Sequence, residues 1–324
     1  MNMTQLIIPI TDNTKFFPRE DYFFPKPLVE IIDKPMIIEV IQHIERAIDI
    51  SKIVFVIPEE LEIQYSLGSI LKLNTSSNIH VVTRSGSTSG GLCSSLLALD
   101  HVDESNSLVV MNMDEIYSCN LGKIIHYFDD CADVGIITFP STHPRWCYAE
   151  IEDNKSVGYV AEKRVISNNA LAGFYYFKSK DLFLELSSKA MIEDDRHGDL
   201  FYISASVNQA VISGYNVKYS SIEYSQYFSL YSPAEISRFK ACMTSDNQTD
   251  LYNLIIPAAG GGSRFAEAGW KSPKPFIDVN GHSMLDHVLN NLYTRSSRPT
   301  LLLQKKYVSE HQHQIEELNK YEVN

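Results

Sequence analysis

Short apolar runs alternate with longer amphipathic stretches at the start of the chain. Residues 6–10 and 53–57 are almost entirely aliphatic or aromatic. Between them, apolar residues recur at the spacing of one helical face: Met36, Ile37, Val40, Ile41 and Ile44. This pattern predicts a strand, a loop, a helix and a second strand. Two strands joined by a helix form a βαβ unit, so we expect these strands to be parallel.

The same alternation continues over most of the chain. Strand-like apolar runs follow at residues 79–82, 108–111, 134–139 and 174–177, and helical stretches lie between them, most clearly at 90–99 and 181–191. Strands that alternate with helices are typical of an α/β domain. We therefore predict one complete α/β domain over residues 1–243.

An internal repeat extends this picture. Leu-Ile-Ile-Pro stands at residues 6–9 and again 248 positions later, at residues 254–257. The same shift, without a gap, matches Phe17 with Phe265, the Pro-Lys-Pro triplet 25–27 with 273–275, Met36 with Met284 and Val40 with Val288. A constant shift over this distance predicts a second copy of the opening βαβ unit.

The second copy is short. A polar segment at residues 244–250 is the predicted linker, and only the 74 residues 251–324 follow it. They are too few to close the same sheet, so we predict a partial repeat, a half-domain. An incomplete sheet leaves an open edge and an uncovered apolar face. We therefore expect this part to pair with a partner, as in a homo-oligomer, or to be locally disordered.

Composition and charge narrow the class of protein. The chain has 324 residues, of which 44% are hydrophobic, enough for a globular protein of about two domains. Its formal charge of -12 argues against nonspecific binding to nucleic acid or to an anionic membrane. We found neither a run of roughly 18 apolar residues nor a basic start followed by a long apolar segment. The five cysteines have no metal-ligand or redox spacing. We predict a cytoplasmic protein.

The second copy carries a glycine-rich turn directly after its first strand. Glycines let backbone N–H groups approach a phosphate chain closely, because no Cβ intervenes. Two cationic side chains nearby would neutralise phosphate charge during transfer. The residues of this turn and its surroundings are Gly260, Gly261, Gly262, Ser263, Arg264 and Lys274.

Together these residues resemble the signature of the nucleotide-sugar pyrophosphorylases, a family of sugar-phosphate nucleotidyltransferases. The resemblance implies a GT-A-like, Rossmann-like α/β fold with three layers and a mixed, mostly parallel sheet. It also implies an enzyme that joins a nucleoside triphosphate to a sugar 1-phosphate and releases pyrophosphate. The first copy resembles the same family over nearly its whole length.

In the first copy the resemblance implies a metal site. Residues 108–114 resemble the family's strand that ends in a metal-binding aspartate. Asp114 is therefore the candidate Mg²⁺ ligand, because a hard cation prefers carboxylate oxygen and bridges phosphates. The alternative is that Asp114 only caps the loop after the strand. Lys26, in the first Pro-Lys-Pro triplet, is the candidate cation that stabilises the transferred phosphate.

Further segments follow in the order of the family. Residues 85–91, which include Thr88 and Gly90, resemble the segment that faces the nucleobase, although small residues before a helix are also ordinary capping chemistry. By the same resemblance Glu162 binds sugar hydroxyls, Lys163 binds the sugar phosphate, and Gly173 lets the sugar lie against the backbone. A Glu-Lys pair is otherwise most often a solvated surface pair.

The first copy departs from the family in two places. The repeat aligns residues 12–16 with Gly260 to Arg264, so that side chains replace three glycines and Phe16 replaces the arginine. Lys15 or Arg19 would have to substitute, without the bidentate geometry of an arginine at that position. In addition, Ser229 stands near the position where the family usually has a second metal-binding carboxylate.

Three hypotheses about function follow. The first is an active nucleotidyltransferase for a sugar phosphate or similar phosphorylated metabolite, serving surface polysaccharide precursors. The second is a degenerate domain that binds a sugar phosphate or nucleotide sugar without turnover. The third is that the chain is a fragment of a longer tandem enzyme.

Overall fold

The chain folds into two compact units. The computed structural model describes residues 3–11, 16–18, 20–152, 156–246, 252–260, 262–292, 297–321 and 323. The units are Met1–Lys240 and Ala241–Asn324, so the division falls three residues before the predicted boundary at residue 243. We describe each unit by itself.

A nine-stranded sheet forms the centre of the first unit in its described part, in the order β10-β9-β11-β6-β1-β4-β5, with β8 and β12 joined to it through β11. The strands are β1 (Thr4–Pro9), β4 (Ile50–Pro58), β5 (Ile79–Arg84), β6 (Leu108–Met111), β8 (Val134–Pro140), β9 (Tyr148–Ile151), β10 (Val157–Ala161), β11 (Asn169–Phe177) and β12 (Val217–Ser221). Two short pairs accompany it: β2 (Glu30–Ile31) with β3 (Lys34–Pro35), and β7 (Glu115–Tyr117) with β13 (Tyr227–Ser229).

The pairing of the strands defines one edge of the sheet as the place for a site. Strands β5, β4, β1 and β6 pair in parallel, whereas β11 is antiparallel to β6 and to β8. Ile7 of β1 lies opposite Val110 of β6, so the chain leaves both strands at the same level, at Pro9 and Asn112. Ligands gather at the carboxyl ends of adjacent parallel strands. The predicted Rossmann-like fold class is confirmed.

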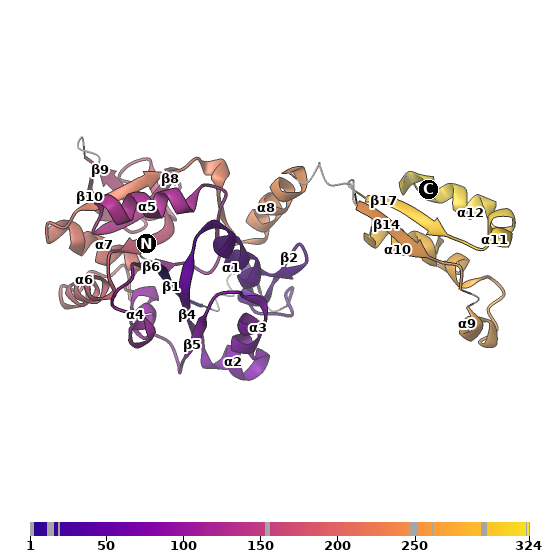
Figure 1. Cartoon of the computed structure of the whole chain (residues 1–324), viewed down its shortest axis with the longest axis horizontal. Coiled ribbons are helices and arrows are strands. Elements are labelled where there is room, and N and C mark those ends of the chain that lie inside the picture. Colours follow the sequence, from indigo (N-terminus) through magenta and orange to yellow (C-terminus); the bar gives the residue numbers. More distant parts are fainter. Residues whose placement is uncertain are drawn as a thin grey trace. The chain divides into compact units, whose positions relative to one another are not determined.

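Helices cover both faces of this sheet (Figure 1). On one face, alternate strand residues such as Val54, Val56 and Val110 pack in a single core with α4, α6 and α7. On the other face Phe128 of α5 lies so close to Gly135 that a Cβ there would meet the ring at 2.5 Å. The helices are α1 (Met36–Ala47), α2 (Glu59–Tyr65), α3 (Leu67–Asn74), α4 (Gly91–Leu96), α5 (Leu121–Cys131), α6 (Lys180–Ile192), α7 (Ile203–Ile212) and α8 (Pro233–Asp246), with 3₁₀ turns η2 (Lys26–Leu28), η3 (Leu99–His101) and η4 (Tyr224–Gln226).

Some elements were not expected from the sequence. Strands β9, β10 and β12 lie on the sheet's outer branches and carry glycine or polar residues, as in the Val-Lys-Tyr-Ser-Ser of β12. Such segments become strands through pairing with a neighbour rather than through their own periodicity. Helix α8 also extends to Asp246, into the segment at 244–250 that was predicted as linker. No helix in the described part of the chain has both the length and the apolar character needed to cross a bilayer.

The second unit begins with the same order of elements as the first. It contains β14 (Tyr252–Pro257), α9 (Ser263–Glu267), η5 (Lys274–Phe276), β15 (Asp278–Val279), β16 (His282–Ser283), α10 (Met284–Leu292), β17 (Ser297–Leu302), α11 (Lys305–Glu310), α12 (Gln312–Glu316) and η6 (Glu317–Tyr321). Strands β14 and β17 pair in parallel, as β1 and β4 do. The elements η5, β15, β16 and α10 each start 248 residues after η2, β2, β3 and α1. A common origin of the two units stays a prediction.

A small core holds the second unit together. It is formed by Ile256 of β14, Leu285 and Leu289 of α10, and Leu318 and Tyr321 of η6. Asp286, also on α10, is buried beside this core, and its carboxylate accepts a hydrogen bond from the Tyr321 hydroxyl at 2.8 Å. The last residues of the chain therefore pack back onto the helix that follows the hairpin β15–β16.

Candidate active site

A two-lobed cleft opens at the carboxyl ends of β1 and β6. One lobe has a volume of about 480 Å³ and the other about 490 Å³. The lobes share lining residues, among them Thr11 after β1, Asn112 after β6, and Lys163 after β10, so they form one continuous space. The cleft lies where the parallel strand order places it, and it holds most of the described residues that the sequence singled out in the first copy.

Asp114 and Lys26 form the polar centre of one lobe. The Lys26 Nζ lies 2.5 Å from the Asp114 Oδ2, and both side chains are largely buried. Lys26 reaches this point because Pro25 and Pro27 hold the η2 turn beside the cleft. The Asp114 carbonyl also accepts a hydrogen bond from the Leu230 N–H at 2.7 Å, which ties the loop after β6 to the segment after β13. The metal-binding role of Asp114 stays a prediction.

Glu115, the next residue, is a functional candidate that the sequence did not indicate. Its side chain is only 3% exposed yet lines both lobes of the cleft. Its Oε1 accepts hydrogen bonds from the Asn112 Nδ2 at 3.2 Å and, at 3.5 Å, from the Ser229 Oγ. The Tyr227 hydroxyl, which is also buried, interacts with the Glu115 carboxyl. Burial, followed by the charge of Asp114, raises the pKa of Glu115 well above its ordinary value.

The centre of the cleft fits a hard divalent cation. The carboxyl groups of Asp114 and Glu115 both line it, and carboxylate oxygen is the donor that Mg²⁺ prefers. Within the described ranges, no cluster of three or more His, Cys, Asp or Glu side chains forms a metal cage. A cation here would therefore complete its coordination with substrate phosphates and water, as Mg²⁺ commonly does.

In the segment between β1 and η2, the structure describes residues 10–11, 16–18 and 20–25. Phe16, which stands where the second copy has Arg264, lines the lobe that contains Lys26 and Asp114. Its ring contacts the Tyr231 ring edge-on, with 5.3 Å between the ring centres. Lys15 and Arg19, the two predicted substitutes for the lost arginine, lie outside the described residues.

Arg145 supplies a cation to the same lobe. It lies between β8 and β9, and its guanidinium stacks on Trp146 at 3.7 Å and on Tyr231 at 3.2 Å from the ring centres. Tyr231 is also the ring that Phe16 contacts. Burial lowers the pKa of Arg145, but an arginine remains charged near neutral pH. We predicted no role for Arg145 from the sequence. Its position next to Trp146 was the signal that could have indicated one.

The turn before α4 forms one wall of the other lobe and requires a glycine. Gly90 has a φ of 118°, and a Cβ there would lie 2.3 Å from the Phe201 carbonyl oxygen. The backbone of residues 89–92 hydrogen-bonds to Phe201 on both sides, which brings the two segments this close. Thr88 donates a hydrogen bond to the Gly90 carbonyl at 3.2 Å. Thr88 and Gly90 both line the cleft, and no side chain caps α4 at this turn.

Glu162, Lys163 and Gly173 line the same lobe. Glu162 accepts a hydrogen bond from the Ser204 Oγ at 2.8 Å, and burial raises its pKa above the ordinary value. Lys163 donates to the Tyr202 hydroxyl, and its backbone adopts a φ of 50° that is uncommon for a non-glycine residue. Gly173, with a φ of 69°, sits where β11 changes register. Both side chains of the Glu-Lys pair line the cleft; Glu162 is half-buried, whereas Lys163 is exposed.

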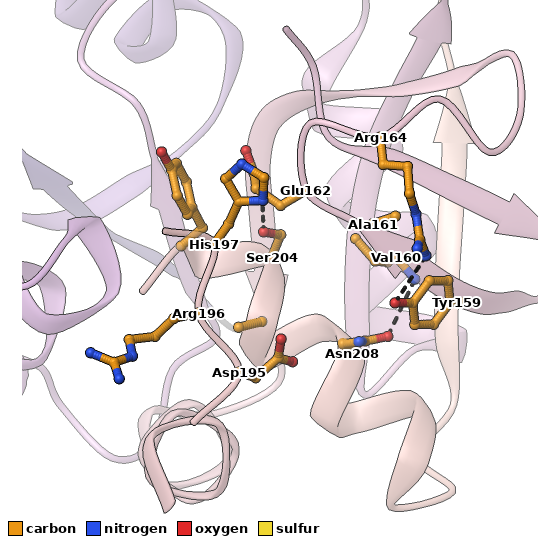
Figure 2. A pocket seen from close by; sticks show the side chains of 12 residues that line it. Tyr159, Val160, Ala161, Glu162, Arg164, Asp195, Arg196, His197, Ser204 and Asn208 are labelled. Carbon is orange, nitrogen blue, oxygen red and sulfur yellow. Dashed lines mark hydrogen bonds between the residues drawn. The ribbon is translucent and has the colours of Figure 1, made fainter. Parts of the chain in front are cut away.

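A smaller pocket of about 240 Å³ adjoins Glu162 (Figure 2). It lies between the end of β10, the segment with Asp195 and His197, and the start of α7. The Val160 N–H donates to the Asn208 side chain at 3.3 Å, which joins β10 to α7 beneath it. Glu162 and Tyr202 line both this pocket and the cleft, so the two spaces adjoin each other.

The glycine-rich loop of the second unit lines a separate cavity of about 580 Å³. Gly260, Gly262, Ser263, Arg264 and Lys274 surround it, whereas Gly261 lies outside the described residues. Gly262 has a φ of 62°, and its Cα lies close to the Lys274 side chain, since a Cβ there would meet it at 3.3 Å. The structure thus brings the loop and Lys274 together within this unit.

The fold and the cleft together define a nucleotidyltransferase-like protein, and the comparisons with known proteins agree. The family described as nucleotidyl transferase matches residues 22–225, and the chain belongs to this family of transferases. No curated protein matches the chain.

Several solved structures share the fold at low sequence identity. A nucleoside-diphosphate-sugar pyrophosphorylase from Vibrio cholerae has a TM-score of 0.64 at 19% identity, covering 73% of this chain and 99% of its own. An inositol-1-phosphate CTP transferase from T. maritima has a TM-score of 0.60 at 14% identity, covering 77% and 98%. A protein described as a glucose-1-phosphate thymidylyltransferase from Bacillus anthracis has a TM-score of 0.58 at 18% identity, covering 74% and 94%.

Proposed function

We propose that the first unit transfers a nucleotidyl group from a nucleoside triphosphate to a sugar 1-phosphate or a similar phosphorylated metabolite, with release of pyrophosphate. The observation that carries this proposal is the single cleft that holds Asp114 and Lys26 in one lobe and Glu162 and Lys163 in the other. A phosphate-handling centre next to a polyol-binding pair is the arrangement such a reaction needs. A role in making surface polysaccharide precursors is part of the proposal.

The reaction would use the side chains in distinct ways. A phosphate oxygen of the acceptor attacks the α-phosphorus of the nucleotide in line, and the bond from that phosphorus to the β-phosphate oxygen breaks, so that pyrophosphate leaves. Lys163 orients the attacking phosphate, and Glu162 accepts hydrogen bonds from hydroxyls of the acceptor. Lys26 stabilises the charge that develops on the transferred phosphate. Asp114 would hold Mg²⁺, which neutralises phosphate charge when bound.

Arg145 compensates in this proposal for the altered loop after β1. The lobe has lost the arginine that Arg264 represents in the second unit, and Phe16 occupies that place. The guanidinium of Arg145 is held by two aromatic rings and reaches the same lobe. A stacked guanidinium retains its hydrogen-bonding fork for phosphate oxygens, which a flexible lysine would not provide.

A non-catalytic binding protein is the second candidate, and Phe16 is the observation that favours it. An apolar ring beside Asp114 and Lys26 contributes no cation to a triphosphate. Under this alternative the cleft would bind a sugar phosphate or nucleotide sugar without turnover, or the chain would be part of a tandem enzyme.

One assay separates these candidates. The purified chain is incubated with Mg²⁺, each nucleoside triphosphate in turn and a panel of sugar 1-phosphates, and pyrophosphate is measured. We expect release with one combination, and we expect Asp114→Ala to abolish it while Asp103→Ala, which removes an exposed carboxylate outside the cleft, leaves it unchanged. Calorimetric binding of the same ligands without any release would instead support the binding protein.

Two further parts of the proposal concern the protein's surroundings. A cytoplasmic location is consistent with a nucleoside triphosphate as substrate. The second is that the chain forms a homo-oligomer through the second unit. Removal of that unit should then lower the sedimentation coefficient by more than the lost mass accounts for.

A further inference from the structure

The pocket beside Glu162 is the middle one of three connected spaces. Glu162 and Tyr202 line both this pocket and the cleft. Asp195 and Asn208 line both the pocket and an open groove of about 610 Å³ along α6 and α7. The 240 Å³ of the pocket are about eight times the roughly 30 Å³ that one water molecule takes up in the liquid. A ligand that lies in the cleft therefore has room to extend past Glu162.

Asn208 is held in one orientation, which fixes where its amino group lies. It stands one turn after Ser204 on α7 and is only 8% exposed. Its Oδ1 accepts a hydrogen bond from the N–H of Val160 in β10, the last strand in the order of the sheet. A backbone N–H must face the oxygen of the amide, so the Nδ2 is the remaining end. This Nδ2 has no hydrogen-bond partner among the described residues, although a buried donor without a partner is destabilising.

Asp195 supplies an acceptor to the same end of the pocket. Figure 2 shows its carboxylate and the Asn208 amide at the end away from Glu162. The Asp195 carboxylate forms neither a hydrogen bond nor an ion pair with the described part of the chain. Arg196 is directed away from the pocket and pairs with Asp194 at 2.6 Å instead. Arg164 is exposed and lies over the Tyr159 ring, at 5.8 Å from its centre.

These two free groups select one class of ligand group. A hydroxyl both donates and accepts, so it satisfies a carboxylate and an amide N–H at once. An ammonium group only donates and would leave the Asn208 Nδ2 unpaired. A phosphate or carboxylate only accepts, and the like charges of Asp195 and Glu162 would repel it. The pocket is therefore suited to uncharged, hydroxylated groups.

We infer that this pocket is a distal subsite for the acceptor, where hydroxyl groups donate to Asp195 and accept from Asn208. The inference deepens the proposed function, on which it rests for the direction of the acceptor. In that proposal Lys163 orients the phosphate in the cleft, and Glu162 accepts from hydroxyls at the boundary with the pocket. The part of the acceptor remote from its phosphate then continues past Glu162. The preferred acceptor carries hydroxyls beyond a single hexose ring, on a side chain or on a second sugar.

Calorimetric binding of four acceptors to the full chain with Mg²⁺ tests this inference. Glucose 1-phosphate is the reference. Maltose 1-phosphate and a heptose 1-phosphate add hydroxyls to the ring at different carbons, and glucosamine 1-phosphate adds an ammonium group. The variants are Asp195→Asn and Asn208→Asp, of which the second retains the oxygen that accepts from Val160. Asp199→Asn is the matched control, because Asp199 is exposed and lines neither the pocket nor the cleft.

We expect the wild type and Asp199→Asn to bind at least one of the two extended acceptors about tenfold more tightly than glucose 1-phosphate, the usual effect of a satisfied hydrogen bond. Asp195→Asn and Asn208→Asp should lose most of this preference, while their affinity for glucose 1-phosphate stays within about twofold of the wild type. Circular dichroism verifies folding. If Asn208→Asp does not fold, Asp195→Asn decides alone, since that side chain is only partly buried.

Three results would overturn the inference: no tighter binding of either extended acceptor by the wild type, an equal loss of affinity for all acceptors in Asp195→Asn, or a preference for glucosamine 1-phosphate. Pyrophosphate release is measured separately with each nucleoside triphosphate. Release without any preference for extended acceptors would remove this inference and leave the proposed function standing. A preference that depends on Asp195, without release, would refute nucleotidyl transfer and leave the distal subsite standing.

Discussion

At the scale of single residues, the cleft depends on side chains whose charge is shaped by their surroundings. Lys26 and Asp114 neutralise each other at 2.5 Å, and Arg145 is held by aromatic rings rather than by an acid. Glu162 is mostly buried next to Ser204, and burial raises its pKa. Perturbed acids beside a cleft are typical of functional sites, because the fold stabilises them only when a ligand compensates for their burial.

Arg145→Lys should reduce kcat on the order of 100-fold in the nucleotidyl transfer assay, the usual cost of losing one charge-stabilising donor. Lysine keeps the charge but lacks the planar fork and stacks poorly between Trp146 and Tyr231. The control is Arg164→Lys, since Arg164 lies over Tyr159 at 5.8 Å and lines the neighbouring pocket instead. Equal kinetics for both variants would show that Arg145 has no part in the reaction.

Glu162→Gln should change the pH dependence of stability. The pKa of Glu162 is raised in the folded chain, so its ionisation favours the unfolded state. The free energy of unfolding of the wild type should therefore fall, relative to Glu162→Gln, as the pH rises above the ordinary glutamate pKa of 4.5. One proton limits the slope to about 1.4 kcal/mol per pH unit. Urea unfolding of both proteins between pH 4 and 8 measures it; a relative gain with rising pH would contradict the assignment.

At the scale of elements, strand β11 lines one lobe of the cleft and contacts the loop that lines the other. It pairs with β6, β8 and β9, and its register against β8 shifts between Leu171 and Tyr175. Gly173 lies within this irregularity at a φ of 69°, and its carbonyl accepts a hydrogen bond from the Asn112 N–H at 3.1 Å. The irregular strand thereby holds the loop after β6, which carries Asp114 and leads into β7.

Gly173→Ala should destabilise the protein by about 1–3 kcal/mol more than Gly214→Ala. Both glycines have positive φ angles, so both variants lose roughly 1–2 kcal/mol to backbone strain. Only at position 173 does the new Cβ collide with a neighbour, the Asn112 Nδ2 at 2.4 Å, whereas position 214 is open. Urea unfolding compares the two. Similar losses would mean that the contact at Gly173 relaxes freely.

At the scale of the whole molecule, the first unit contains every described residue of the cleft. Its last helix, α8, buries Ile236 and Phe239, and the Phe239 ring packs against Phe228 of β13. The second unit has its own small core and its own cavity at the glycine-rich loop. Each unit therefore has the minimum that an independent domain requires, a core and a set of local contacts.

Truncation after Asp246 should leave nucleotidyl transfer within about twofold of the full chain, a difference of ~0.4 kcal/mol in transition-state stabilisation. This end point retains α8, which the first unit needs to cover Phe228. In the full chain, Arg264→Ala and Lys274→Ala should likewise leave kcat unchanged. Steady-state kinetics of the truncated chain and of the two variants, each compared with the full chain, test this prediction. A loss of turnover on truncation would show that the second unit contributes to the reaction.

The sequence by itself determined the fold class and the order of the main elements. Residues 6–9 of β1, 53–57 of β4 and 108–111 of β6 form apolar runs because both faces of a central parallel strand are buried. The spacing of Met36, Val40 and Ile44 likewise predicted α1, because one helical face is buried. Asp114 was predicted as a metal ligand because residues 108–114 resemble the family's strand that ends in a metal-binding aspartate.

Only the tertiary structure decided which other side chains complete the cleft. Arg145, between β8 and β9, and Tyr231, after β13, are distant in sequence, yet their side chains contact each other. Glu115 follows Asp114 directly, yet it is buried beside Ser229, 114 residues away in the sequence. Periodicity reports which face of an element is buried, but it does not report which distant element covers that face. The cleft is built from such long-range contacts.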